Sequence, residues 1–125
     1  MKLIAILLSL SLAPWLSMNQ PSHKLVIFTG SDWCPNCKQF DKSILKDSSF
    51  IKYTLNHQIQ VELVDFPQRS FQSDSLKQAN IKSADFFNFN GQFPSVYLLN
   101  LKDSSVRKID YNHDSPVEFC KALSN

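Results

Sequence analysis

The segment KLVIFTGSDWCPNCKQF, from Lys24 to Phe40, places two cysteines behind a continuous apolar run. That run, Leu25–Phe28, contains two β-branched residues and is followed closely by Gly30, which is typical of a short buried strand. After Pro35 the apolar residues recur with the period of a helix. The two cysteines are therefore predicted to lie where a strand ends and a helix begins.

The chain has three cysteines, and their spacing separates one pair from a single residue. Cys34 and Cys37 are three positions apart and Cys120 lies near the C-terminus, so the economical pairing joins Cys34 to Cys37. A disulfide that closes so short a loop adds little stability, because the entropic benefit of a crosslink grows with the loop. The pair is therefore predicted to be a redox couple, and Cys120 a small buried apolar residue.

A metal site is not indicated by the sequence. Zinc normally takes four ligands, and the residues left to complete a site around the cysteine pair have no paired spacing: Cys120, His23, His57 and His113. We therefore expect no metal and no other cofactor.

The position of Cys34 predicts that the pKa of its thiol is lowered. With Pro35 at the first helical position, Cys34 is the N-cap, facing the free amides of Asn36 and Cys37 and the positive end of the helix dipole. Free cysteine titrates near pH 8.5, and cysteines in such motifs titrate between about 3.5 and 7.5. We expect Cys34 to attack a substrate disulfide and Cys37, one turn further and shielded from solvent, to resolve the mixed disulfide.

The rest of the chain alternates predicted strands and helices. Three further strands are expected at Ile59–Phe66, Ser95–Asn100 and Val106–Tyr111, and a helix at Phe71–Phe87. A last helix begins after Ser115, where a serine cap, a proline and a glutamate form a capping box. This order predicts an α/β fold in which parallel strands are joined by helices and closed by a C-terminal hairpin and a covering helix.

The first seventeen residues, MKLIAILLSLSLAPWLS, resemble a secretory signal. The apolar run of about 14 residues is shorter than the roughly 20 that a membrane-spanning helix needs. We expect a signal peptide at residues 1–17, cleaved between residues 13 and 20, and an exported, periplasmic protein. The alternative is a core or interfacial helix, which the lack of apolar–polar alternation disfavours.

The charge of the chain excludes one class of partner. Its 13 basic and 11 acidic residues are spread without runs of like charge, so no nucleic-acid interface is expected.

Three segments together resemble the thioredoxin-like family: the cysteine segment above, VELVDFP at residues 61–67, and GQFPSVYLLN at residues 91–100. The resemblance covers nearly all of residues 22–125, and within the family it is greatest to small exported disulfide oxidoreductases. It implies a three-layer sandwich in which helices flank a mixed sheet of about four strands. It also implies a cis peptide bond before Pro94, with Phe93 and Pro94 beside Cys34, where they bind substrate backbone. Trp33 is expected to contact the bound peptide, with a core tryptophan as the alternative.

Two features depart from thioredoxin. Thioredoxins commonly carry a buried aspartate six residues before the first cysteine, where this chain has Phe28. The proton of the resolving thiol must then pass to water, to Asp32 or to another group. The motif residues Pro35 and Asn36 replace the glycine and proline of thioredoxin and resemble glutaredoxin and the oxidant DsbA, so the direction of the reaction stays open.

The favoured hypothesis is an exported thiol-disulfide oxidoreductase, acting as a reductase or isomerase on disulfide-containing exported proteins. A membrane-bound or soluble redox partner would reset the cysteines, and the protein is expected to be a monomer. Two alternatives stay open. One is an oxidant of the DsbA type. The other is a non-enzymatic module that holds a peptide with the Pro94 loop and a cluster of aromatic side chains, Phe86, Phe87, Phe89 and Phe93.

Overall fold

The computed structural model describes residues 20–125. The predicted signal peptide at residues 1–17 lies outside this range. Among the described residues, no helix is both long enough and apolar enough to cross a membrane.

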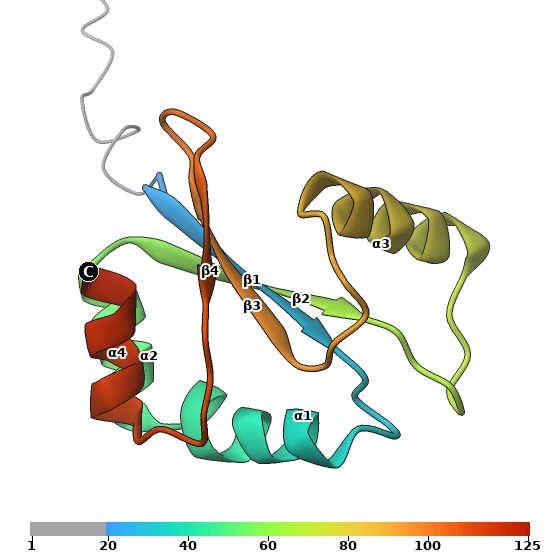
Figure 1. Ribbon diagram of the computed structural model, residues 1–125, viewed down its shortest axis with the longest axis horizontal. Coiled ribbons are helices and arrows are strands. Elements are labelled where there is room, and N and C mark those ends of the chain that lie inside the picture. Colours follow the sequence, from blue (N-terminus) through green and yellow to red (C-terminus); the bar gives the residue numbers. More distant parts are fainter. Residues whose placement is uncertain (1–19) are drawn as a thin grey trace, which may run out of the picture.

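A four-stranded sheet runs through the centre of the molecule, with the order β2-β1-β3-β4 (Figure 1). Its strands are β1 (His23–Thr29), β2 (Ile59–Asp65), β3 (Ser95–Asn100) and β4 (Val106–Ile109). Strands β1 and β2 are parallel, β3 is antiparallel to β1, and β4 is antiparallel to β3. The prediction of a mixed sheet with four strands is confirmed.

The direction of β3 differs from the expected parallel arrangement. Strand β2 ends at Asp65, opposite Thr29, and β3 begins at Ser95, opposite Phe28. The connection between β2 and β3 thus leaves and rejoins the sheet at the same end, so β3 must run back along β1.

Helices cover both faces of the sheet, which confirms the three layers (Figure 1). One face packs against α1 (Pro35–Phe40), the π-helical turn η2 (Asp41–Leu45), α2 (Ser48–Asn56) and α4 (Pro116–Ser124). The other face packs against α3 (Asp74–Phe86) and the aromatic residues near it.

Strand β1 lies between β2 and β3 and is buried on both faces. Leu25 and Ile27 belong to the core beneath α1, α2 and α4, whereas Val26 and Phe28 belong to the core beneath α3. Side chains alternate between the two faces of a strand, so a strand buried on both requires an unbroken apolar run. The same run carries the chain directly to the cysteine pair.

Helix α4 forms as predicted. Oγ of Ser115 accepts the Glu118 N–H at 3.3 Å, and Oε2 of Glu118 accepts the Ser115 N–H at 3.2 Å, which completes the capping box. Cys120, on the inner face of this helix, is a free and buried cysteine, as expected. Burial raises the pKa of its thiol, which keeps it in the unreactive protonated form.

Helix α3 is shorter than predicted at its N-terminal end. It begins at Asp74, where Oγ of the cap Ser73 accepts the Leu76 N–H at 3.3 Å. Phe71, expected to be helical, instead lies in the loop before it with 94% of its surface exposed. Distant hydrogen bonds hold this loop in a non-helical conformation, and they belong to the site described next.

Candidate active site at the Cys34–Cys37 disulfide

Cys34 and Cys37 form a disulfide at the N-terminus of α1, with their Cα atoms 5.2 Å apart. The predicted pairing is thus confirmed. Cys34 is the N-cap of α1 in extended backbone geometry, and its sulfur accepts the N–H of Cys37 at 3.2 Å. Pro35 occupies the first turn, also as predicted. Asn36 is exposed beside it. The amide of the helix end that reaches the Cys34 sulfur is therefore that of Cys37.

The expected difference in exposure between the two cysteines is wrong for this disulfide form. Cys34 is 4% exposed and Cys37 is 3% exposed. The turn after β1 folds back over both residues: the Cys34 N–H donates to the carbonyl of Gly30 at 2.9 Å, and the Gly30 N–H donates to the Cys37 sulfur at 3.4 Å. The chemical asymmetry of the pair therefore lies in the helix cap at Cys34 rather than in solvent access.

Trp33 joins the redox turn to two other loops. Its Nε1–H donates to the carbonyl of Phe66 at 2.7 Å, and its ring meets the Phe93 ring edge-to-face at 5.2 Å. Gly30 permits this arrangement, because a Cβ atom at position 30 would overlap the indole. Trp33 is half-buried, so it is neither a core residue nor a free surface side chain.

Phe93 reaches the site from the start of β3. The peptide bond between Phe93 and Pro94 is cis, as the family resemblance implied. Because the Phe93 ring lies against that of Trp33, the residue before Cys34, the loop that carries Pro94 is brought to the redox turn. Residues 33 and 93, sixty positions apart in sequence, thus lie side by side.

The aromatic cluster behind Phe93 is a core and not a free surface. Phe28 is fully buried, and its ring centroid lies 4.4 Å from that of Phe89 and 5.9 Å from that of Phe87. Phe93 contacts Phe89 in turn, at 5.1 Å. Of the rings that the sequence suggested as a peptide-holding cluster, Phe86 alone is largely exposed, at 59%. The others already have partners, so this geometry does not favour the non-enzymatic module.

Asp32 has a role that the sequence did not reveal. Its carboxylate accepts the N–H groups of Gln68, Arg69 and Ser70, at 2.9, 2.8 and 2.8 Å respectively. These bonds, that of Gln68 foremost, hold the pKa of Asp32 far below its ordinary value. A carboxylate so stabilised is a poor proton acceptor, which removes Asp32 from the candidates for the proton of Cys37. No local signal marks this role, because the donors lie 36 to 38 positions along the chain.

The hydrogen bonds of Asp32 predict a specific dependence of stability on pH. Replacing Asp32 with asparagine is expected to destabilise the protein more at about pH 6 than at about pH 2. The folded-state pKa is depressed, so the stabilisation is complete above the unfolded-state value of about 3.9 and is lost as the pH falls through the folded-state value. Urea unfolding of wild type and variant at both pH values gives the difference in free energy of unfolding. The contributions of the other carboxyl groups cancel in this difference. An effect of the substitution that does not shrink in acid would contradict the assignment.

A cavity of about 520 Å³ opens beside Cys37, on the flank of α1. Thr29 and Ser31 contribute polar walls, and Lys38 and Lys42 line it from the helix. This cavity lies next to the resolving cysteine and is large and polar enough to admit water.

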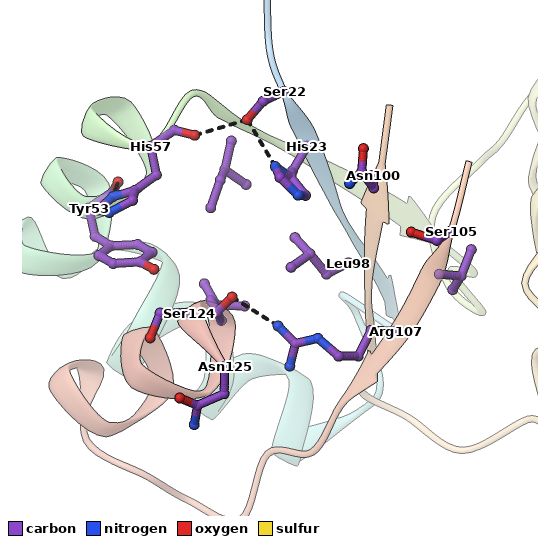
Figure 2. A pocket seen from close by; sticks show the side chains of 13 residues that line it. Ser22, His23, Tyr53, His57, Leu98, Asn100, Ser105, Arg107, Ser124 and Asn125 are labelled. Carbon is purple, nitrogen blue, oxygen red and sulfur yellow. Dashed lines mark hydrogen bonds between the residues drawn. The ribbon is translucent and has the colours of Figure 1, made fainter. Parts of the chain in front are cut away.

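A second cavity, of about 500 Å³, lies at the start of β1, the end of the sheet opposite the disulfide (Figure 2). Ser22 Oγ is 2.9 Å from Nδ1 of His23 and donates to the carbonyl of His57 at 3.2 Å. Across the cavity, the Arg107 guanidinium donates to the carbonyl of Leu123 at 2.9 Å (Figure 2). These contacts tie β1, α2, β4 and α4 together, and none of the predicted site residues lies among them. In the part of the chain that the structure describes, no cluster of three or more potential metal ligands occurs.

Two curated proteins from Chlamydia pneumoniae are similar in sequence, while no family model matches the chain. The chain is 30% identical over 103 residues to the disulfide bond reductase DsbH, a match that covers 81% of this chain and 61% of that protein. It is 31% identical over 85 residues to the thioredoxin-related protein DsbJ, covering 68% of this chain and 24% of that protein. The matches thus span less than two thirds of either relative.

Solved structures are similar over most of the chain. A DsbH oxidoreductase matches with a TM-score of 0.75 at 23% identity, covering 83% of this chain and 71% of that chain. A thioredoxin from Thermus thermophilus matches with a TM-score of 0.53 at 16% identity, covering 82% of this chain and 71% of that chain.

Proposed function

We propose that this chain, whose fold is thioredoxin-like, is a thiol-disulfide oxidoreductase with Cys34 and Cys37 as its redox couple. The observation that carries the proposal is the disulfide at the N-terminus of α1, where the Cys34 sulfur caps the helix. Helix N-termini stabilise thiolates, and a thiolate is both the nucleophile and the good leaving group of disulfide exchange. The sequence similarity to a disulfide bond reductase supports the same conclusion.

The exchange takes place in two balanced steps. The Cys34 thiolate of the reduced protein attacks one sulfur of a substrate disulfide, forming a mixed disulfide and releasing the first substrate thiolate. The Cys37 thiolate then attacks the Cys34 sulfur, which closes the intramolecular disulfide and releases the second substrate thiolate. Two electrons pass to the substrate, whose two thiolates take up protons from solvent.

Cys37 must lose its proton before the second step. Phe28 stands where thioredoxins carry an aspartate, and the Asp32 carboxylate is occupied by backbone amides. The cavity beside Cys37 supplies the remaining route, through which the proton passes to water. We therefore assign no side chain as the general base.

The substrate polypeptide is proposed to bind along Trp33, Phe93 and Pro94. Trp33 directly precedes Cys34 and its ring meets that of Phe93, the neighbour of Pro94, so the half-buried indole and phenyl rings offer apolar contact beside the disulfide. Disulfides persist in oxidising compartments, so the proposed substrates are exported, disulfide-containing proteins, in agreement with the signal-like segment at residues 1–17. Repeated turnover in the reducing direction also requires a partner that returns electrons to the couple.

Reduction is the favoured direction, because the curated relative DsbH is a disulfide bond reductase. The deciding experiment is the equilibrium reduction potential of the couple against glutathione, measured in a Cys120→Ala variant so that one couple titrates. A potential near −270 mV, like that of thioredoxin, is expected. A potential near −120 mV, like that of DsbA, would identify an oxidant and overturn the reductase assignment.

A further inference from the structure

The loop between β2 and α3 presents a large apolar side chain next to the redox turn. Phe71 is 94% exposed, which makes it the most exposed large apolar residue that the structure describes. Within residues 20–125 it belongs to neither of the two core clusters. Single exposed apolar residues are common and need no explanation by themselves. The position of Phe71 and the way its loop is held are what distinguish it.

The backbone on both sides of Phe71 is fixed. Ser70 donates its N–H to Asp32 at 2.8 Å and its hydroxyl to the same carboxylate at 3.1 Å. Gln72, on the other side, donates its side-chain N–H to the Asp65 carbonyl at 3.0 Å. Phe71 is thus held between two anchored residues, and ordering its backbone costs little further entropy when it binds a partner.

The anchor at Asp32 also places the loop beside the disulfide. Asp32 precedes Cys34 by two residues, and the turn that contains both is itself bonded to β2, because Ser31 N–H donates to Asp65 at 2.9 Å. Figure 1 shows the loop after β2 descending beside the turn between β1 and α1. A polypeptide whose disulfide reaches Cys34 therefore passes close to this loop, which continues the proposed substrate surface beyond Trp33.

Charge indicates what kind of polypeptide segment fits. Arg69 lies two residues before Phe71 on the same loop, is exposed, and forms no ion pair within the described part of the chain. An apolar ring with a guanidinium nearby complements a segment that carries both an apolar and an acidic side chain.

We propose that Phe71 and Arg69 form a docking arm for the substrate polypeptide and select substrates with an apolar and an acidic residue beside the reactive cysteine. The inference rests on the proposed function. It assigns specificity to a loop that takes no part in the exchange chemistry, so substrate choice and redox chemistry are separable.

The test compares two synthetic peptides, each with one disulfide, whose cysteines are flanked by Leu and Glu in one and by Ser and Lys in the other. Wild type is expected to reduce the Leu–Glu peptide with a kcat/KM about tenfold higher than the Ser–Lys peptide, mainly through KM. Phe71→Ser should remove most of this preference, and Arg69→Glu should shift it toward the Ser–Lys peptide. Neither variant should change the reduction potential or the rate with bis(2-hydroxyethyl) disulfide, a small uncharged disulfide that cannot span the loop.

Leu55→Ser is the matched control. Leu55 is also strongly exposed, at 74%, but it lies in the last turn of α2, close to the start of β2 and far along the sheet from the disulfide. This variant should behave as wild type with both peptides.

Equal activity of wild type and Phe71→Ser on both peptides would overturn the docking arm and leave the proposed function intact. If Phe71→Ser lost activity equally on the small disulfide, the docking arm would also be overturned, because Phe71 would then support the redox site itself. Absence of exchange by wild type with every disulfide would refute the proposed function together with the arm.

Discussion

Cys34→Ser is expected to abolish disulfide exchange, lowering the rate of insulin reduction by at least about 1000-fold, to the uncatalysed level. The reason is that the attacking thiolate is lost and a serine hydroxyl at a helix N-terminus remains protonated at neutral pH. Cys34 is the N-cap whose sulfur meets the positive end of α1, and Cys37 lies one turn further along the helix. Turbidity from precipitating insulin chains, with dithiothreitol as electron donor, measures the rate.

The variant Cys37→Ser separates the two roles. It retains the nucleophile but cannot resolve the first product, so a mixed disulfide between Cys34 and substrate should accumulate and be visible on a non-reducing gel. Cys120→Ala is the matched control, because Cys120 is buried and remote from the couple, and it should retain full activity. Trapping of substrate on Cys37 in the Cys34→Ser variant, at a comparable rate, would show that the roles are reversed.

Phe28→Ala is expected to lower the free energy of unfolding by about 3–5 kcal/mol. Phe28 is fully buried and meets four rings, at centroid distances of 6.4, 5.9, 4.4 and 5.6 Å, from Phe66, Phe87, Phe89 and Tyr97. Truncation removes this burial and leaves a cavity between β1 and α3 that rigid aromatic neighbours cannot fill. Because small domains are stable by only about 5–15 kcal/mol, the variant would be close to unfolding at 37 °C. Urea denaturation followed by tryptophan fluorescence gives the value.

The control for this prediction is Phe71→Ala, the same substitution at an exposed ring. Its effect on unfolding should stay within about 0.5 kcal/mol, because no packing is lost. A loss below about 1 kcal/mol for Phe28→Ala would mean that the cluster tolerates the cavity, contrary to its close packing. The substitution Phe28→Asp, which restores the residue common in thioredoxins, should be more damaging still, since the carboxylate would replace a ring among aromatic side chains.

Several parts of the fold could be predicted from short stretches of sequence. Strand β3 has the predicted bounds, the capping box of Ser115 and Glu118 starts α4, and Pro35 starts α1. Each depends on interactions within a few residues: a short continuous apolar run, or a side chain that bonds an amide of the same turn. The Cys34–Cys37 pair belongs to this group, because one helical turn brings its two sulfurs together.

The predictions that were wrong, and the features that the sequence did not reveal, depend on residues far apart along the chain. The direction of β3, the equal burial of the two cysteines and the loop conformation around Phe71 all differ from the expectations drawn from sequence. The sequence predicted a helix from Phe71, but Asp32 accepts the N–H groups of Arg69 and Ser70, the two residues before it, and holds them in a loop.

The sequence alone therefore determined the position of the cysteine pair, on which the proposed redox chemistry depends, because a cysteine pair at a helix start is a local arrangement. The tertiary structure determined the surroundings of that pair. It shows that Asp32 is a loop anchor and not a proton acceptor, and that Phe93 lies against Trp33. It also shows that the loop carrying Phe71 borders the site, because Ser70 bonds Asp32. Such contacts join residues 36 to 60 positions apart. Periodicity and capping patterns do not predict them, because those patterns depend only on residues close together in the sequence.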